Sequence, residues 1–314
     1  MIIVFGSINM DIFMSVEHLP VPGETVLSPA YEMSPGGKGA NQALAAARSG
    51  AKVAMIGRVG DDGMGARVLN NLRRAGVMTS GIVQSEQSTG CAVIARDAKG
   101  ENQILVALGA NADVIHEQIP DEILGSRNMV LMQNEILPEQ NWKIIERAHQ
   151  IGATTILNLA PAIHIPEPIL KKLDYLIVNQ IEVRQIAAAM NLPAENHELQ
   201  IAGALSRMGN LTCIVTMGDR GSFAITPEGQ EIHVPALKLE TFVDKTGAGD
   251  AYCGTFAAAL HAGMPLIEAL KRAAVAGSLT CLKKGAQPSF PYLGDIEENL
   301  AKLGEVSVRT LANH

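Results

Sequence analysis

The sequence predicts an α/β fold in which a mostly parallel sheet is flanked by helices and a smaller β-sheet is attached. From residue 52 onward, short apolar runs typical of buried strands alternate with runs whose apolar spacing suits helices. Such alternation requires crossover connections, which make neighbouring strands parallel. Two pairs of more exposed strands interrupt this pattern. The 314 residues are 47% hydrophobic and 18% charged, which is enough apolar material for one large domain or two smaller ones.

The main sheet is predicted from short apolar runs. These runs are residues 1–7, 53–56, 129–132, 154–157, 175–178 and 211–215, followed by a hairpin at 223–225 and 231–234. The helices are predicted at residues 43–49, 63–75, 142–149, 183–189, 251–260, 265–282 and 295–303. Gly50 and Gly76 follow the first two of these helices, where glycine commonly ends a helix because it tolerates a left-handed backbone.

The smaller sheet is predicted from two strand pairs, at 12–16 with 25–33 and at 91–96 with 102–108. Residues 97–100 join the second pair as a hairpin. Small sheets at the mouth of a site often act as lids. We therefore expect a lid formed by residues 12–35 and 88–110, and a main domain formed by residues 1–11, 36–87 and 111–314.

Polar side chains follow several of the predicted strands. Asn9 and Asp11 come after the first strand, and Glu135, Asn158 and Asn179 come after three later ones. In open α/β sheets, ligands bind beyond the carboxyl ends of the strands. Each of these residues could instead close a turn or cap a helix, so it is their recurrence that favours a binding crevice. The first turn has a single glycine where a dinucleotide-binding motif needs G-x-G-x-x-G, which argues against a dehydrogenase.

The stretch from Asp244 to Asp250 connects a short strand-like run to an apolar helix. Gly247, Ala248 and Gly249 carry almost no side chain, so a phosphate can approach the unpaired N–H groups of the first helical turn. Asp250 stands beside this predicted anion hole, where a carboxylate suits an enzyme that removes a proton during phosphoryl transfer. The alternative is a plain glycine turn followed by an acidic residue that favours the positive end of the helix dipole.

Two other glycine-rich stretches contain candidate ligand contacts. In residues 35–42, Gly37 lets a ligand or lid close on the backbone. Lys38 and Asn41 offer donors to a polyhydroxylated ligand, unless Lys38 is simply an exposed lysine. The second stretch combines a hydroxyl, two glycines and an arginine that suit phosphate oxygens, although a plain turn is the alternative. Its residues are Thr216, Gly218, Arg220 and Gly221.

Composition narrows the classes of function. A net charge of −7 without any Lys/Arg-rich run argues against a nucleic-acid partner. Four widely spaced cysteines indicate reduced thiols rather than a disulfide framework or a metal site. We recognise neither a signal peptide nor an apolar run of roughly 18 residues, so we expect a cytoplasmic protein without a membrane span.

Several motifs together resemble the ribokinase-like (PfkB) family of carbohydrate kinases. Residues 36–42 with 57–62 resemble the N-terminal signature of that family, and residues 244–250 resemble its C-terminal signature. Further matches occur in order at 179–182, 216–221 and 284–289, so the resemblance covers about residues 2–300. It implies a three-layer α/β/α fold with a mostly parallel central sheet, a β-sheet lid, and a homodimer formed through the lids. It also implies transfer of the γ-phosphate of ATP to the 5-hydroxyl of D-ribose.

The resemblance implies a role for each motif. Asp250 would be the base, beside an anion hole formed by the N–H groups of Gly247, Ala248 and Gly249. The sugar would be held by Asn9, Asp11, Gly37, Lys38, Asn41 and Glu135, together with Asp250 itself. The nucleotide would contact Asn179, Thr216, Gly218, Arg220, Gly221 and Gly249. Glu182 would position Mg²⁺ through water. A monovalent cation, generally K⁺, would be surrounded by Asp244, Thr246, Thr280, Lys283, Gly285 and Ser289.

A few positions depart from the family pattern. Leu159 stands where many relatives have proline, and residues 180–181 are Gln-Ile where Glu-Thr is usual. Ala274 aligns with an asparagine that lies near adenine in some relatives, which weakens any prediction of adenine selectivity. Two alternatives stay open, namely a nucleoside or other sugar kinase of the same family and a non-catalytic regulator that binds a sugar or nucleotide. The intact Asp250 and its glycine stretch argue against the regulator.

Overall fold

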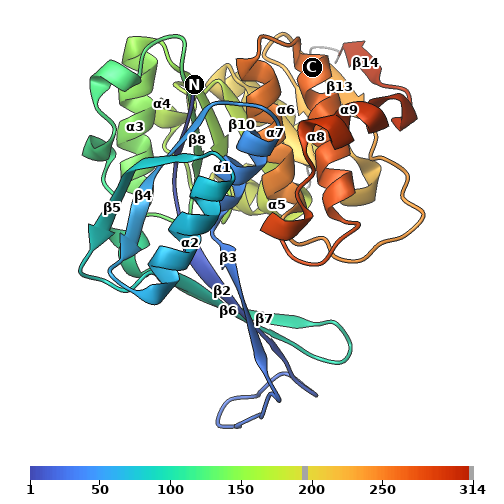
Figure 1. The fold of residues 1–314 in the computed structure, drawn as a ribbon. Coiled ribbons are helices and arrows are strands. Elements are labelled where there is room, and N and C mark those ends of the chain that lie inside the picture. The colour runs from blue at the N-terminus through green and yellow to red at the C-terminus, as the bar shows by residue number, and fades with distance from the viewer. Residues whose placement is uncertain (193–196, 311–314) are drawn as a thin grey trace.

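A computed structural model of the protein describes residues 1–192 and 197–310, and its main body is built on a ten-stranded sheet (Figure 1). The strands are β1 (Ile2–Phe5), β4 (Val53–Gly60), β5 (Met78–Ser85), β8 (Met129–Gln133), β9 (Thr154–Asn158), β10 (Tyr175–Asn179), β11 (Thr212–Thr216), β12 (Ser222–Ile225), β13 (Gln230–Val234) and β14 (Ser307–Thr310). Their order is β14-β13-β12-β11-β10-β9-β8-β1-β4-β5. The pairs from β5 to β11 are parallel and those from β11 to β14 are antiparallel. This confirms the mostly parallel sheet.

Helices cover both faces of the sheet. They are α1 (Lys38–Arg48), α2 (Gly63–Arg74), α3 (Pro138–Ile151), α4 (Glu167–Leu170), α5 (Gln180–Ala189), α6 (Glu198–Gly209), α7 (Ala248–His261), α8 (Leu266–Thr280) and α9 (Leu293–Asn299). Short 3₁₀ turns occur at Gly109–Asp113, His116–Gln118, Asp121–Ile123, Gly218–Arg220, Gln287–Ser289 and Leu300–Lys302. Within the described ranges, no helix combines the length and apolar character needed to cross a bilayer.

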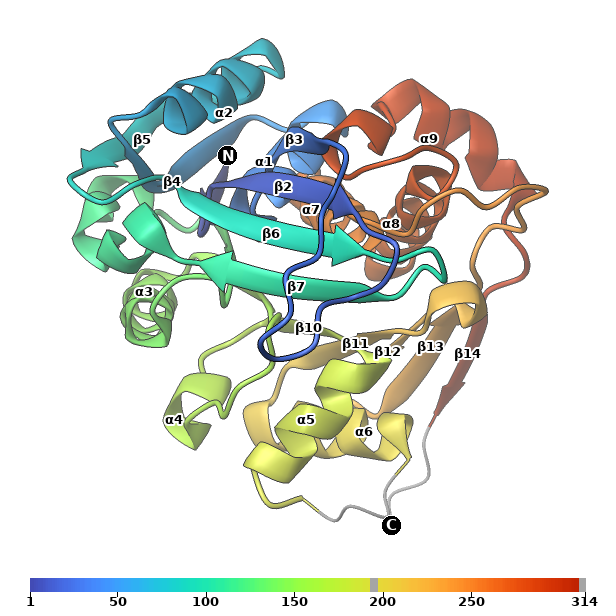
Figure 2. The ribbon, with the colours of Figure 1, turned by 90° about the horizontal axis from the view of Figure 1, so that it is seen from below.

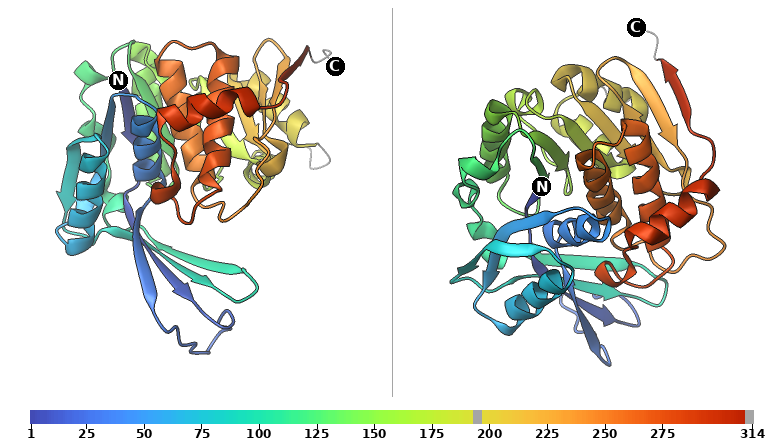
Figure 3. Two further views of the ribbon diagram at one scale, coloured as in Figure 1. Left: turned by 45° about the vertical axis from the view of Figure 1, so that its right-hand side comes forward. Right: turned by 45° about the horizontal axis from the view of Figure 1, so that its top comes forward.

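The layers follow from the alternation of apolar side chains along the strands. In β1, Ile2 and Val4 pack in a core with α1, α2, α7 and α8, whereas Ile3 and Phe5 pack in a second core with α3 to α6. All four side chains are fully buried, so the strand is apolar on both faces. The three-layer α/β/α arrangement is thereby confirmed, and Figure 3 shows helices on both sides of the sheet.

A second sheet of four strands projects from one end of the main body (Figures 1 and 3). Its order is β3 (Tyr31–Gly36), β2 (Asn9–Ser15), β6 (Gly90–Arg96) and β7 (Asn102–Ala107). β2 pairs with β3 in antiparallel and with β6 in parallel orientation. Figure 2 shows these strands from below, in front of the main body. The small separate sheet is confirmed, while the domain boundaries and the action of the sheet as a lid stay predictions.

Some element boundaries differ from the sequence prediction. α1 begins at Lys38 rather than at residue 43, because Gly39 lets its first turn pack against Ser7, where a Cβ would lie 2.7 Å from backbone atoms. The predicted strand at 25–33 is wrong for residues 25–30, which are irregular. Four elements, β5, α4, α6 and β14, are absent from the prediction. β5 and β14 are edge strands that expose most of their residues at least in part, so they lack a clear apolar signal.

Candidate active site

The backbone that leads into α7 has the geometry that the glycine stretch predicts. Gly247 precedes the helix in a left-handed conformation with a φ of 81°, and a Cβ there would lie 2.7 Å from Phe290 and 2.8 Å from Ala286. Glycine is therefore required both by the backbone angle and by the close packing. At Gly249, by contrast, no neighbouring atom lies within 4 Å of the place where a Cβ would be. This side of the turn is open to a ligand.

The N–H groups of this turn are not equally available. Ala248 donates its N–H to the carbonyl of Lys245 at 3.1 Å. Within the part of the chain that the structure describes, no hydrogen bond uses the N–H of Gly249. Because the first N–H groups of a helix lie at its positive end, Gly249 offers a better anion contact than Ala248. An anion hole that uses all three residues remains a prediction.

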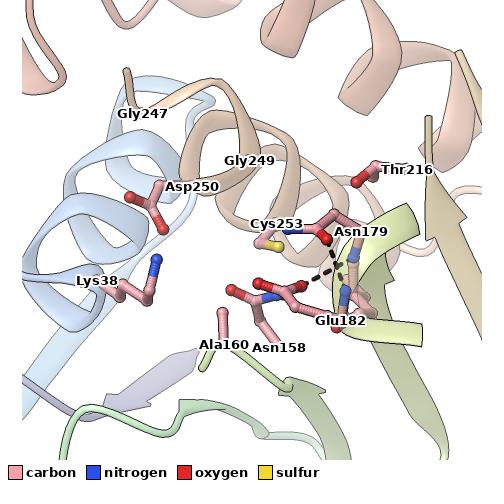
Figure 4. Close-up of a pocket in the computed structure, with 11 residues that line it drawn as sticks. Lys38, Asn158, Ala160, Asn179, Glu182, Thr216, Gly247, Gly249, Asp250 and Cys253 are labelled. Atoms are coloured by element: carbon pink, nitrogen blue, oxygen red, sulfur yellow. Dashed lines mark hydrogen bonds between the residues drawn. The ribbon is translucent and has the colours of Figure 1, made fainter. Parts of the chain in front are cut away.

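Asp250 lies in the first turn of α7, and its carboxylate is held by two donors from α1. Asn41 donates Nδ2–H to Oδ2 at 2.9 Å, and Gln42 donates Nε2–H to Oδ1 at 3.0 Å. Asp250 is only 8% exposed. Burial raises the pKa of Asp250, and the charge of Lys38 and the two amide donors oppose that rise. Figure 4 shows the amine of Lys38 pointing toward the carboxylate.

Two cavities meet at this turn. The smaller has a volume of about 200 Å³ and contains Asp250 in its lining (Figure 4). The larger has a volume of about 880 Å³ and extends toward α8, where Ala274 lies in its lining. Both cavities are lined by Asn179, Thr216 and Gly249. Two ligands that bind in the two cavities would therefore meet at Gly249, next to Asp250.

Ionisable groups of both signs share the smaller cavity and its surroundings. Burial lowers the pKa of Lys38, but the carboxylates of Asp250, Glu135 and Glu182 outweigh this effect, so the pKa is raised and the amine stays charged. Burial, and after it the charges of Glu135 and Asp250, raises the pKa of Asp11 to about 7. Mutually perturbed groups of this kind are typical of functional sites rather than of stabilising surface pairs.

The residues predicted to hold a sugar come together at the junction of β2, α1 and β8. Glu135 accepts a hydrogen bond from the N–H of Lys38 at 2.9 Å. Asn9 is buried, with its Oδ1 accepting from Asn111 at 2.7 Å. Gly37 has a φ of 85°, and a Cβ there would lie 2.6 Å from the nitrogen of Asn9. Only Lys38 and Asp250 of this group line the smaller cavity itself.

On the nucleotide side, Asn179 and Glu182 form a reciprocal helix cap at the start of α5. The Asn179 side chain accepts from the N–H of Glu182 at 2.9 Å, and Glu182 Oε2 accepts from the N–H of Asn179 at 2.8 Å. Burial raises the pKa of Glu182, and the hydrogen bond from the N–H of Asn179 and the charge of Lys38 only partly oppose this rise. Gly218 and Gly221 line the larger cavity. The side chain of Arg220, absent from the lining of either cavity, donates to Gln180 at 3.2 Å.

The residues predicted to surround a monovalent cation lie in two adjacent loops. Asp244 Oδ1 accepts from the N–H and the hydroxyl of Thr246 at 3.0 and 2.7 Å, and its Oδ2 accepts from the N–H of Gly285 at 2.9 Å. Burial raises the pKa of Asp244, but these hydrogen bonds outweigh it and lower the pKa overall. The side chains of Thr280 and Ser289 donate to carbonyls of their own segments, and Lys283 is exposed. In the described ranges, no group of three or more His, Cys, Asp or Glu side chains forms a metal cluster.

The residue roles derived from the sequence omit three buried glutamines that complete the surroundings of Asp250. Gln42 donates to Asp250, Gln133 donates to Gln42 Oε1 at 2.7 Å, and Gln287 donates to Asn41 Oδ1 at 2.9 Å. Gln42 and Gln287 stand inside the motifs quoted above, and Gln133 ends β8. Their positions gave a signal, but their contacts join segments up to 246 residues apart, which no local pattern predicts.

Comparison with known proteins assigns this fold and site to a family. The family model described as pfkB family carbohydrate kinase matches residues 1–292. The chain therefore belongs to the pfkB family of carbohydrate kinases, and it is a phosphotransferase that acts on a sugar.

Individual relatives cover nearly the whole chain. A ribokinase of Schizosaccharomyces pombe is 34% identical over 307 residues, which are 94% of this chain and 96% of that protein. A deoxyribokinase of Salmonella typhi is 34% identical over 304 residues, covering 96% of this chain and 98% of that protein. Among solved structures, Arabidopsis thaliana ribokinase complexed with ribose and ATP superposes with a TM-score of 0.86 at 30% identity, over 95% of this chain and 98% of that one.

Proposed function

We propose that the protein is an ATP-dependent ribokinase that transfers the γ-phosphoryl group to O5 of D-ribose. The observation that carries the proposal is the buried carboxylate of Asp250, held by two amide donors at the point where the two cavities meet. The ribokinase relatives over the full chain and the ribose–ATP complex of the Arabidopsis protein support ribose as the acceptor.

In this proposal Asp250 is the base. Its ionised carboxylate orients the 5-hydroxyl of the sugar and accepts the proton as the bond from O5 to phosphorus forms and the bond to ADP breaks. A loose transition state releases that proton late, so orientation of the hydroxyl is most of the task. The N–H of Gly249 and the positive end of α7 face the charge that develops on the transferring group. Lys38 adds a further positive charge on the sugar side.

The larger cavity suits a nucleotide. Its volume of about 880 Å³ lies within the usual range of small-molecule sites. We expect the phosphates to lie near Thr216, which lines both cavities, and near Gly218 and Gly221, and the base to lie near Ala274 of α8. Glu182 Oε1 has no hydrogen-bond partner among the described residues, so it is free to hold Mg²⁺ through water. When bound, Mg²⁺ neutralises charge on the phosphates.

We also propose that K⁺ binds between the loops at residues 244–246 and 280–289. One carboxylate, from Asp244, together with main-chain carbonyls, suits a large and weakly hydrated cation better than Mg²⁺. Asp244 already links Thr246 and Gly285, so a cation there would stiffen the backbone that leads to Gly247. The Lys283 side chain has no acceptor, so only its main-chain carbonyl is a candidate ligand, whereas Ser289 can offer its carbonyl or the lone pairs of the hydroxyl that donates to Ala286.

The small sheet is proposed to act as a lid and to form a homodimer in the cytoplasm. The exposed fractions of Ile104, Leu105 and Val106 in β7 are 58%, 74% and 50%. Ile104 and Val106 lie on one face of β7 and Leu105 on the other, and exposed apolar side chains of this kind favour burial against a second subunit. Lys284 contacts Glu32 of β3 at 2.8 Å, which joins the small sheet to the proposed cation loop. Closure of the lid would exclude water, which competes with the sugar as phosphoryl acceptor.

The test is acceptor-dependent release of ADP. Ribose, 2-deoxyribose, fructose, 2-keto-3-deoxygluconate, adenosine and inosine are compared at equal concentration, with phosphorus NMR to locate the new phosphate. The proposal predicts that ribose has the highest kcat/KM and that its product carries phosphate on O5. A higher kcat/KM for 2-deoxyribose, for another sugar or for a nucleoside would show that ribose is not the preferred acceptor. No release of ADP with any acceptor would refute catalysis.

A further inference from the structure

The two donors that hold Asp250 belong to a chain of side-chain amides that extends away from the site on both sides. On one side, Gln287 Nε2 donates to Asn41 Oδ1 at 2.9 Å, and Asn41 Nδ2 donates to Asp250 Oδ2 at 2.9 Å. On the other side, Gln133 Nε2 donates to Gln42 Oε1 at 2.7 Å, and Gln42 Nε2 donates to Asp250 Oδ1 at 3.0 Å. Each carboxylate oxygen thus receives one amide.

The direction of every bond in this chain follows from the carboxylate. An ionised Asp250 only accepts, so Asn41 and Gln42 must each turn their NH₂ toward it. Their amide oxygens then point away, and the groups that meet those oxygens must donate in turn. Gln287 meets this requirement for Asn41, and Gln133 meets it for Gln42. Because Gln133 must turn its NH₂ toward Gln42, its Oε1 is left buried without a hydrogen-bond partner, which is unfavourable in free energy.

Gln287 is itself fixed from both ends. Asn71 Nδ2 on α2 donates to its Oε1, which leaves its NH₂ facing Asn41. Arg48 on α1 donates to its main-chain carbonyl at 2.7 Å and to the carbonyl of Phe290 at 2.8 Å. Gln287 is 2% exposed, so water cannot replace these contacts. The residue touches neither cavity.

We propose that Gln287 is a positioning residue for catalysis, which fixes the amide of Asn41 so that its NH₂, and not its oxygen, faces Asp250. This inference rests on the proposed role of Asp250 as base. Without Gln287, the Asn41 amide can rotate and present its oxygen to the carboxylate. Two acceptors would then face each other, and Asp250 would gain a proton or turn away from the sugar hydroxyl. Because Asn41 is also a proposed sugar contact, the loss falls on the sugar side of the reaction.

The test compares two replacements of Gln287. Gln287→Met removes both the donor and the acceptor at similar volume, and we expect kcat/KM for the sugar to fall about 10-fold, within the range for loss of one hydrogen bond to a charged group. Gln287→Glu keeps the shape but provides only acceptors, which turns the NH₂ of Asn41 away from Asp250, so we expect a larger fall of about 100-fold. KM for ATP should change less than about twofold in both.

A readout independent of turnover is the protonation of Asp250 itself. Carboxyl-labelled aspartate, assigned with Asp250→Asn, is titrated by carbon NMR in each protein. We expect the pKa of Asp250 to rise by about one unit in Gln287→Met, since one fixed donor to its ionised form is lost. The charged groups that also face Asp250 are Asp11, Lys38, Glu135 and Glu182, and the thiol of Cys253 lies beside it. None of them is changed by the substitution.

The controls separate positioning from a structural role. Gln118→Met removes a partly buried glutamine that donates to the carbonyls of Gly57 and Gly81 and has no hydrogen bond to the amide chain, and it should leave the sugar kinetics and the pKa of Asp250 unchanged. Asn71→Ala frees Gln287 indirectly and should give a smaller change of the same sign, which keeps the test valid if Gln287→Met does not fold. The inference fails if Gln287→Glu is at least as active as Gln287→Met, or if the pKa of Asp250 is unchanged. If no acceptor is phosphorylated by the wild type, the proposed function fails, whereas the titration still tests this inference.

Discussion

Asp11→Asn should stabilise the fold at alkaline pH while it weakens sugar binding. Burial, followed by the charges of Glu135 and Asp250, raises the pKa of Asp11 from 3.8 to about 7, and Lys38 opposes the rise. In the unfolded chain the carboxyl group titrates near its ordinary value of about 3.9. The folded protein therefore keeps a proton that the unfolded chain releases between about pH 4 and pH 7. The free energy of unfolding falls as pH rises through this window.

The size of the effect follows from the shift. A rise of about three pKa units corresponds to at most about 4 kcal/mol, which is present below pH 4 and lost above pH 7. Unfolding entropy of about 2.1 cal/mol/K per residue gives a change in Tm of about 1.5 °C per kcal/mol for 314 residues. A neutral asparagine removes the cost of the charge. Asp11→Asn should therefore raise Tm by at most about 6 °C at pH 8 and by only about 2 °C at pH 5, where about a third of the effect has developed.

The assay is thermal unfolding of wild type and variant at both pH values, together with KM for ribose and for ATP. KM for ribose should rise far more than KM for ATP, because an amide accepts fewer hydrogen bonds from sugar hydroxyls than a carboxylate. Asp61→Asn at an exposed position makes the same change of charge and should leave Tm and both KM values unchanged. A variant that is destabilised at pH 8, or that shows equal changes in both KM values, would refute the reasoning.

Three further predictions concern the surroundings of the site. Gly247→Ala should lower both Tm and kcat, because the new Cβ would lie 2.7 Å from the side chain of Phe290. Gly263→Ala, at the same φ of 81° but with open space around it, should lower Tm alone, and equal effects of the two variants on kcat would contradict this account. Activity should rise with K⁺ concentration at constant ionic strength, and Asp244→Ala should lose this activation. Wild-type activity that does not depend on K⁺ would refute the cation site. Leu105→Lys should convert a dimer into a monomer in sedimentation analysis, and a monomeric wild type would disprove the proposed interface.

The main architecture is predictable because it depends on local periodicity. The apolar runs at residues 53–56, 129–132 and 175–178 are buried on both faces, so their strand character appears directly in the sequence. β5 and β14 lie at the edges of the sheet and carry polar residues, which leaves no comparable signal. The start of α1 was predicted too late because glycines normally disfavour helices, whereas Gly39 is needed there for contact with Ser7.

The site was predictable in its motifs but not in its contacts. The stretch around Asp250 is recognisable in the sequence by its small residues at a helix start, and Asn41 stands in a second glycine-rich stretch. What holds Asp250 is a set of amides from α1, β8 and the loop at 287, which tertiary folding alone brings together. Gln287 stands in a motif and Gln133 does not, but neither position reveals this role, because a buried amide is recognised only by its partners.

The most direct test of the central claim is phosphoryl transfer by Asp250→Asn, measured together with ribose binding by calorimetry. Asparagine keeps the size of the side chain but cannot accept the proton of the 5-hydroxyl. The account predicts a fall in kcat of about 10²–10⁴-fold, the usual loss when a general base is removed, while ribose still binds measurably. Retention of more than about a tenth of the wild-type kcat would contradict the assignment of Asp250 as the base.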